Sequence, residues 1–294
     1  MRPGEQSRGV STVLDVTLCL LLVSASVLVV VTAERPDRSD ATGADHAVEL
    51  LGATTATVEY SLAPGARRAD QSLVSFPDTE GEAFDRQSHG SLADLLARAA
   101  IANATVDGQP ISHAGNEFER AVANTTHRRL GGLDHDWQVV ATWEPTGEGP
   151  VRGQVTVGDT PPASTDVHAA SVRVAVGPVV DTSAPDDWND LAYRTASCTI
   201  GTLFPPDRGH LALLGDYPGD RLTAYRYRRA AGFLGTDLDG TLDEAAAHRA
   251  NQRLTAALAG RVEPALRSRY DSPATAADAI APGTVVVTVR TWSA

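Results

Sequence analysis

The sequence predicts an α+β domain that is anchored by one N-terminal transmembrane helix. Residues 10–33 form a long apolar run. Downstream, runs with strand-like alternation are followed by runs whose apolar residues recur three or four positions apart. No repeat of fixed period is present. This order predicts the parts 1–9 (cytoplasmic leader), 10–33 (transmembrane helix), 34–45 (polar linker), 46–180 (strand-rich α+β part) and 181–294 (helix-rich part with a C-terminal strand).

The apolar run is long enough to cross a membrane. As a helix, its 24 residues would extend about 36 Å, against about 30 Å for the hydrocarbon core of a bilayer. Arg2 and Arg8 precede the run, and basic residues favour retention of a terminus in the cytoplasm. We therefore expect a single-pass protein of the cell membrane with a cytoplasmic N-terminus, an extracellular C-terminal domain and the lipid bilayer as a partner.

A cleaved secretory signal peptide is the alternative for this segment. Val31-Thr32-Ala33 is a small-residue stretch of the kind that precedes a cleavage site, although the apolar run exceeds the usual 7–15 residues. Asp15 is the charge inside the run. It is either an interfacial carboxylate that reaches water or an acid with a role in the membrane.

The start of the run resembles the class III signal of archaeal type IV pilin-like proteins. The resemblance lies in Arg8-Gly9-Val10-Ser11-Thr12-Val13 and the apolar helix that follows. It implies cleavage by a prepilin peptidase between Gly9 and Val10, and other pilin-like subunits as partners. Related minor pilins carry an acid at the fifth residue after the cut, for helix registration. Here Leu14 is fifth and Asp15 sixth, so the match is offset by one.

Composition argues against a nucleic-acid partner and indicates a high-salt environment. The formal net charge is -12 and the chain contains no lysine. Nucleic acids bind basic surfaces, so we expect no nucleic-acid partner. Arginine as the only base, with many Asp residues, is typical of halophilic archaea, where salt screens self-repulsion. A GC-rich genome is the alternative source of this composition.

Strands and helices are expected in the following order. Strand-like alternation occurs at 54–62, 137–143, 151–157, 171–176 and 284–292, the last with three valines on one face. Residues 46–51 are expected to begin a short helix or to continue the membrane stalk. Further helices are expected from Ser91 as N-cap and at 116–130, 188–202, 221–234 and 241–259. The helix from Thr241 would open with the capping box Thr-Leu-Asp-Glu and bend or break at Gly260 and Pro264. Residues 63–89 are expected to be loop.

No residue set predicts catalysis, a cofactor or a metal. The sequence from Thr236 to Leu242 resembles the first motif of haloacid-dehalogenase-type phosphatases, whose aspartates follow a buried parallel strand. The preceding residues 230–235 are a poor strand, and the motif's downstream lysine has no counterpart. Asp237, Asp239 and Asp243 also fail the EF-hand spacing for calcium. We therefore interpret the motif as a turn and a helix cap.

The remaining candidates are weaker. Asn103 and Asn124 open glycosylation triplets of the form Asn-X-Thr. Cys19 and Cys198 lie in different compartments of the predicted protein, so no disulfide between them is expected. The resulting hypothesis is a non-catalytic, pilin-like structural component of an archaeal secretion or surface-filament system. The alternative is a membrane-anchored extracellular binding module unrelated to filaments.

Overall fold

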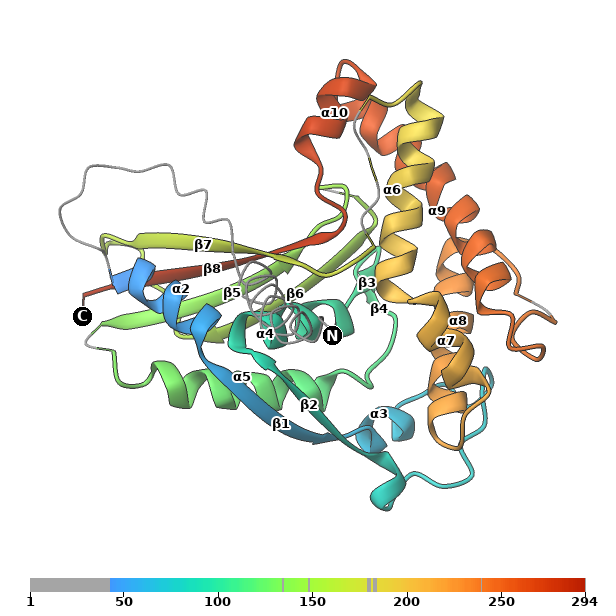
Figure 1. The fold of residues 1–294 in the computed structure, drawn as a ribbon, viewed down its shortest axis with the longest axis horizontal. Helices are drawn as coiled ribbons and strands as arrows, with labels where there is room; N and C mark the ends of the chain where they lie inside the picture. The colour runs from blue at the N-terminus through green and yellow to red at the C-terminus, as the bar shows by residue number, and fades with distance from the viewer. Residues whose placement is uncertain are drawn as a thin grey trace, which may run out of the picture. The chain divides into compact units, whose positions relative to one another are not determined.

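The computed structural model describes residues 43–293 apart from 134, 148, 179, 180, 182, 183 and 239. Residues Ala41–Ala294 form one compact unit, in which a sheet and its covering helices occupy one half and a group of helices the other (Figure 1). The described elements confirm the α+β class. The leader, the apolar segment 10–33 and most of the linker lie outside the described residues.

The main sheet has six antiparallel strands in the order β4-β3-β6-β5-β8-β7. A second sheet is the antiparallel pair β1-β2. The strands are β1 (Thr55–Ser61), β2 (Asp85–Ser91), β3 (Thr105–Val106), β4 (Gln109–Pro110), β5 (Asp136–Trp143), β6 (Val151–Gly158), β7 (His168–Ala175) and β8 (Thr284–Trp292). All five strands expected from alternation are therefore confirmed, within two or three residues at their ends.

The main sheet is buried on one face. In β6, buried and exposed residues alternate strictly along the strand, as period-two packing requires. Val285, Val287 and Val289 of β8 are fully buried, as the sequence predicts. Because β8 pairs with both β5 and β7, the last strand of the chain lies inside the sheet. The C-terminal end of the helix-rich part thus completes the strand-rich part.

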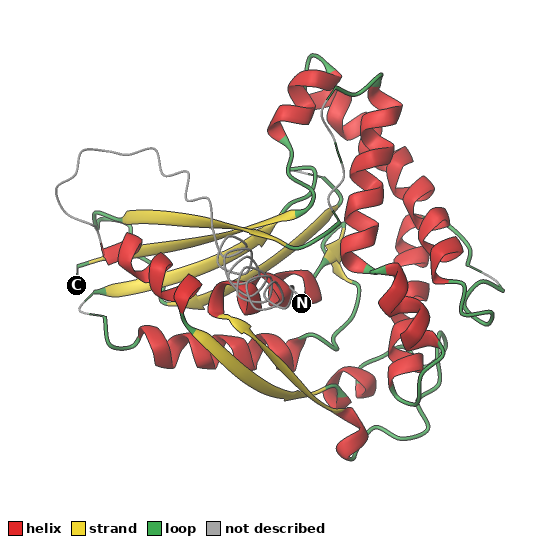
Figure 2. Cartoon of the chain, viewed as in Figure 1, coloured by secondary structure: helices red, strands yellow, loops and turns green. Residues whose placement is uncertain are grey.

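Three helices cover the buried face: α2 (Gly43–Ala53), α4 (Leu92–Ala102) and α5 (Asn116–Leu130). Helix α4 begins where predicted, because the Ser91 side chain accepts a hydrogen bond from the Asp94 N–H. Its residues Leu92, Leu95 and Leu96 are fully buried in the main core. Figure 2 shows these helices beside the strands.

Residues 63–89 are not all loop, which corrects the prediction. They contain α3 (Ala63–Arg67), a 3-10 turn at Glu82–Phe84 and most of β2. Strand β2 escapes detection because its inward positions are Arg86, Ser88 and Gly90 rather than apolar residues. Its pairing with β1 places these positions beside α4, where Arg98 Nη1 donates to the Ser88 hydroxyl at 3.0 Å, instead of in a hydrophobic core.

The helical half contains α6 (Trp188–Leu203), α7 (Pro206–Leu213), α8 (Gly219–Leu234), α9 (Ala247–Arg269) and α10 (Pro273–Ala279). Helices α6 and α9 pack along each other. Thr195, Thr199 and Thr202 of α6 are buried, and each hydroxyl donates to the carbonyl four residues earlier. Polar side chains are thereby accommodated in a helix interface.

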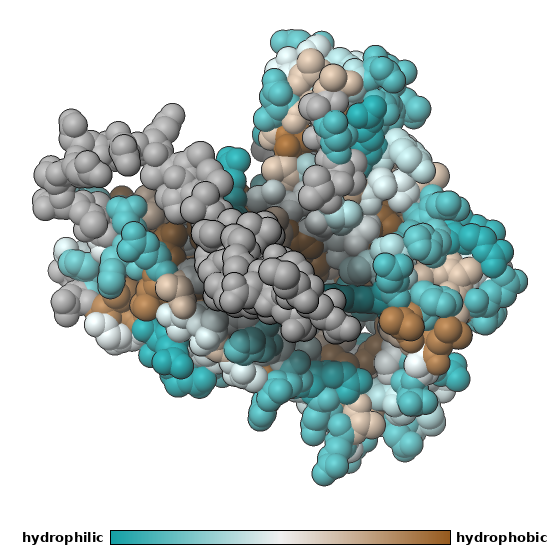
Figure 3. Space-filling model, viewed as in Figure 1, coloured by the Kyte–Doolittle hydropathy of each residue, from teal (hydrophilic) through white to brown (hydrophobic). Residues whose placement is uncertain are grey.

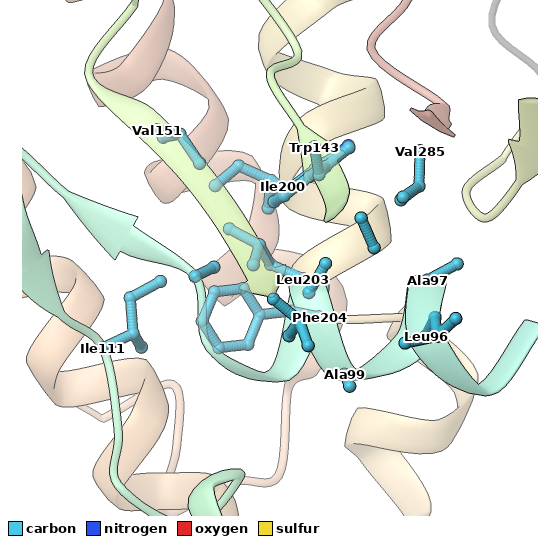
Figure 4. Close-up of a cluster of buried hydrophobic side chains, with 14 of the residues drawn as sticks. Leu96, Ala97, Ala99, Ile111, Trp143, Val151, Ile200, Leu203, Phe204 and Val285 are labelled. Atoms are coloured by element: carbon cyan, nitrogen blue, oxygen red, sulfur yellow. The ribbon is translucent and has the colours of Figure 1, made fainter. Parts of the chain in front are cut away.

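One continuous core joins the two halves. Figure 4 shows Leu96 and Ala97 of α4, Trp143 of β5 and Ile200 of α6 converging on the same region. The buried Trp143 ring also donates its Nε1–H to the Pro282 carbonyl at 2.9 Å. The two predicted parts, divided near residue 180, therefore share one hydrophobic core.

Helix α9 corrects two predictions. It begins at Ala247 rather than at Thr241, and its N-cap Ala246 has no side-chain cap. The Thr241 hydroxyl instead donates to the Leu238 carbonyl in a turn. The helix also continues through Gly260 and Pro264, both of which are exposed. The carbonyl that Pro264 leaves without a donor can be hydrated there, while Leu258, Val262 and Leu266 remain buried on the opposite face.

Candidate functional site

The residues that carry the pilin-like resemblance, Gly9 and Val10 among them, lie outside the part of the chain that the structure describes, and so do Asp15 and Cys19. Within the part of the chain that is described, no helix combines the length and apolarity needed to cross a membrane. Cys198 is a buried free thiol that donates to the Pro178 carbonyl at 3.3 Å, and burial raises its pKa.

The two glycosylation candidates occupy different settings. Asn103 is the C-cap of α4, and its amide donates to the carboxylate of Glu119 on α5. Asn124 is exposed in the middle of α5, but its triplet partner Thr126 is fully buried. Asn124 is therefore the more accessible of the two side chains.

The acidic loop after α8 does not follow a strand. Residues Ala230–Leu234, which precede the phosphatase-like motif, are the last turn of α8. Asp237 and Asp243 line a cavity of about 250 Å³, in which Arg228 Nη2 lies 3.8 Å from Asp243 Oδ1. Across the described ranges, which omit Asp239, no group of three or more His, Cys, Asp or Glu side chains is arranged to hold a metal.

The candidate site is a larger cavity of about 320 Å³, which we call the arginine cavity. It lies between the β1-β2 hairpin, the start of α5, and helices α7 and α8. Pockets for small ligands begin at about this size. The side chains that bear most directly on its chemistry are Tyr60, Arg86, Ser112, Phe118, Thr223 and Arg226.

Close backbone contacts fix one wall of the arginine cavity. A Cβ added at Gly65 of α3 would lie 2.4 Å from Ala114 Cα, so only glycine allows α3 to approach this loop. At Gly115, the N-cap of α5, an added Cβ would lie 2.8 Å from the Ala102 carbonyl oxygen. These contacts bring the ends of α4 and α5 together at the cavity wall.

The opposite wall comes from the hairpin. Tyr60 of β1 and Arg86 of β2 face each other across the pair. The Tyr60 ring packs against Phe118 of α5, with ring centroids 4.9 Å apart. Arg86 Nη1 donates to the Ala83 and Asp85 carbonyls at 2.8 Å, which holds the guanidinium over the hairpin end.

The lining of the arginine cavity is positive in an acidic protein. Among the described residues, Arg86 and Arg226 belong to the lining, whereas no Asp or Glu does. Burial raises the pKa of Tyr60, although Arg86 and Arg98 oppose that shift, so the phenol stays neutral and keeps its proton to donate. Burial also lowers the pKa of Arg226, whose Nη2 donates to the Leu203 carbonyl at 3.2 Å. Its guanidinium carbon lies 5.4 Å from the Phe204 ring centroid.

Two helix N-termini also lie at the cavity, although the N–H groups of Asn116, Gly219 and Asp220 already donate to backbone carbonyls. Gly115 is the N-cap of α5 and Gly219 the first residue of α8, and both line the cavity. Neither helix has a side-chain cap on its first N–H groups. The partial positive charge of both helix ends is therefore close to the cavity. Ser112, which is 5% exposed, also lines the cavity and accepts from the Ala114 N–H at 3.0 Å.

Sequence reasoning missed the arginine cavity entirely. Its residues come from separated stretches between Tyr60 and Arg226, and Arg86 lies in the segment expected to be loop. The one indication in the sequence is Tyr60. It occupies an inward position of the predicted strand, where its hydroxyl follows two apolar inward residues. That signal indicates a polar neighbour without identifying it.

These features define an α+β domain with a one-sided antiparallel sheet and a positively lined cavity. The chain matches, over residues 14–292, a family described as a family of unknown function (DUF7284), and it belongs to that family. No curated protein and no solved structure matches it.

Proposed function

We propose that this chain is a single-pass membrane-anchored, pilin-like structural component of an archaeal secretion or surface-filament system, without catalytic activity. The observation that carries the proposal is Arg8-Gly9-Val10 directly before the apolar segment 10–33. In this proposal a prepilin peptidase cuts after Gly9. The segment from Val10 then holds the protein in the bilayer or packs with other pilin-like subunits.

Two further observations support the anchor. The family match begins at residue 14, so most of the apolar segment belongs to the same family region as the folded domain. Helix α2 begins at Gly43, only a short polar linker beyond the segment. A folded domain close to a hydrophobic helix suits a subunit that is carried at the membrane surface.

Cell fractionation with affinity purification tests the proposal. We expect the full chain in the membrane fraction and a variant that begins at residue 34 outside it. The reason is that a membrane span needs about 20 consecutive apolar residues, which the variant loses with the apolar segment. We also expect a secretion ATPase or filament subunits to co-purify with the full chain. A full chain found in the soluble fraction would refute the anchor. A membrane-bound chain purified without such partners would refute the filament role.

The arginine cavity favours a second candidate function, a membrane-anchored extracellular binding module unrelated to filaments. A preformed cavity with convergent polar groups is a feature of ligand-binding proteins, and a purely structural subunit does not require one. The same purification separates the two candidates, because a binding module remains in the membrane without filament partners.

A further inference from the structure

We infer that the arginine cavity binds a small organic carboxylate that has an apolar body. The inference concerns the folded domain and does not depend on the anchor or on the filament role. It supplies a ligand class for the binding-module candidate. It can fail while the fractionation result stands, because the two experiments measure different properties.

The positive charge of the lining favours a negatively charged ligand. The protein has a formal net charge of -12, yet the described lining of this cavity contains two arginines and no Asp or Glu. Acidic residues adjoin the cavity in sequence, but the ion pairs of Glu117 and Asp220 are with arginines outside the lining, although Asp220 Oδ1 is buried without a hydrogen-bond partner among the described residues. Glu117 contacts Arg120, and Asp220 Oδ2 lies 3.3 Å from Arg221 Nε. An anion can therefore enter without displacing a carboxylate that already holds Arg86 or Arg226.

The arginines retain donors for such an anion. A guanidinium carries five N–H groups in a planar fork. The contacts within the described part of the chain use Arg226 Nη2 for the Leu203 carbonyl and Arg86 Nη1 for two hairpin carbonyls. These bonds orient each guanidinium and leave further N–H groups to donate to a carboxylate. The Tyr60 and Ser112 hydroxyls supply two more donors in the lining.

The apolar part of the lining selects among anions. Leu62, Phe118 and Leu222 line the cavity together with Ala102, Ala114 and Ala212. These walls can bury hydrocarbon, whereas the oxygens of a phosphate that do not face an arginine would lose water against the apolar walls without gaining hydrogen-bond donors. At about 320 Å³ the space suits one small molecule. An aromatic or branched monocarboxylate matches the positive charge of the arginines, the volume of the cavity and the apolar lining.

Isothermal titration calorimetry on the full chain, purified in detergent at a fixed KCl concentration, tests the inference. The probe is sodium benzoate. Benzamide serves as the neutral isostere, inorganic phosphate as the anion without an apolar body, and empty micelles as the blank. We expect saturable benzoate binding, with benzamide and phosphate each at least about tenfold weaker, because a charge-assisted pair and an apolar contact each contribute at that scale.

Matched variants locate the binding. Arg86→Gln and Arg226→Gln should each weaken benzoate binding about tenfold or more. Arg129→Gln, at the exposed far end of α5, removes the same charge outside the cavity and should leave binding unchanged. Arg86→Gln decides the test if Arg226→Gln fails to fold, because the hydrogen bonds of Arg86 are to carbonyls of its own hairpin.

Four results would overturn the inference. They are no saturable benzoate binding, equal affinity for benzoate and benzamide, phosphate binding as tight as benzoate binding, or wild-type affinity in a folded Arg86→Gln protein. The last result would mean that any benzoate bound lies outside the arginine cavity.

Discussion

Tyr227 offers the sharpest quantitative test of the packing between the helices. Its side chain on α8 is fully buried, and its ring stacks on Phe204 at 4.4 Å between centroids. Its hydroxyl donates to Asn251 Oδ1 at 2.9 Å, and Asn251 Nδ2 donates onward to the Phe204 carbonyl at 2.7 Å. The substitution Tyr227→Phe removes one hydroxyl from this chain of hydrogen bonds and keeps the ring.

At pH 8 the substitution should lower the free energy of unfolding by about 1 kcal/mol, the usual net value of one hydrogen bond. Asn251 is only partly buried, so water can replace part of the loss. Raising the pH should change the stability difference between the two proteins in the opposite direction, in favour of the variant. Burial raises the pKa of Tyr227 to about 12, whereas an unfolded tyrosine titrates near 10.

A raised pKa in the folded state gives stability that is fully present below pH 10 and is lost as the pH rises toward 12. The unfolded chain ionises first and is thereby favoured. At about 1.4 kcal/mol per pH unit, wild type should lose about 2 kcal/mol by pH 11.5 through this group alone. The phenylalanine variant lacks this loss, so it should be less stable than wild type at pH 8 and more stable at pH 11.5.

Urea unfolding of both proteins at the two pH values measures how the difference between their free energies of unfolding changes with pH. Other groups that titrate in the same range, including Tyr60 and Cys198, are common to both proteins and cancel. An unchanged difference between the proteins at the two pH values would show that Tyr227 is solvated, and would refute the packing of α8 described above.

Three further tests of the fold use substitutions and thermal or urea unfolding. Gly153→Ala in β6 should cost several kcal/mol, because the new Cβ would lie 2.2 Å from the Ala100 carbonyl oxygen of α4; a cost below about 1 kcal/mol would contradict that approach. Pro264→Ala should stabilise the protein by about 2 kcal/mol, since it relieves a helix-interior proline of α9 at an exposed position; destabilisation would show that α9 needs the distortion. Val287→Ala should cost about 2–3 kcal/mol, while Thr156→Ala on the open face of the sheet should change stability by less than about 0.5 kcal/mol; equal effects would contradict a one-sided sheet.

Elements whose amphipathic pattern is set by core packing could be read from the sequence. The three buried valines of β8 and the buried leucines of α4 repeat with the periods of a strand and a helix. Ser91 could be recognised as an N-cap because its hydrogen bond is local. In each case, nearby residues suffice to specify the structure.

Features that depend on tertiary contacts could not be read in this way. The inward positions of β2 include Arg86 instead of apolar residues. The strand therefore lacks the apolar alternation by which a strand is recognised in a sequence. Helix α9 passes through Pro264 because its opposite face is buried, a fact that local propensity does not contain. The arginine cavity joins Tyr60, Ser112 and Arg226, which only the folded chain brings together.

The Asp-rich motif shows the reverse case, in which a local resemblance is not supported by its surroundings. Thr236 and Asp237 follow the last turn of α8, whereas the phosphatase chemistry requires a preceding parallel strand. The described strands all pair antiparallel. The described residues of this stretch, 236–238 and 240–242, therefore connect α8 to α9, with Leu238, Thr241 and Leu242 buried.

Intact mass analysis of the protein extracted from its native membrane tests the central proposal most directly. The pilin-like account predicts a mature chain that begins at Val10, with the apolar segment retained and Met1 to Gly9 removed. A chain that retains Met1, or one that begins beyond Ala33, would contradict the account.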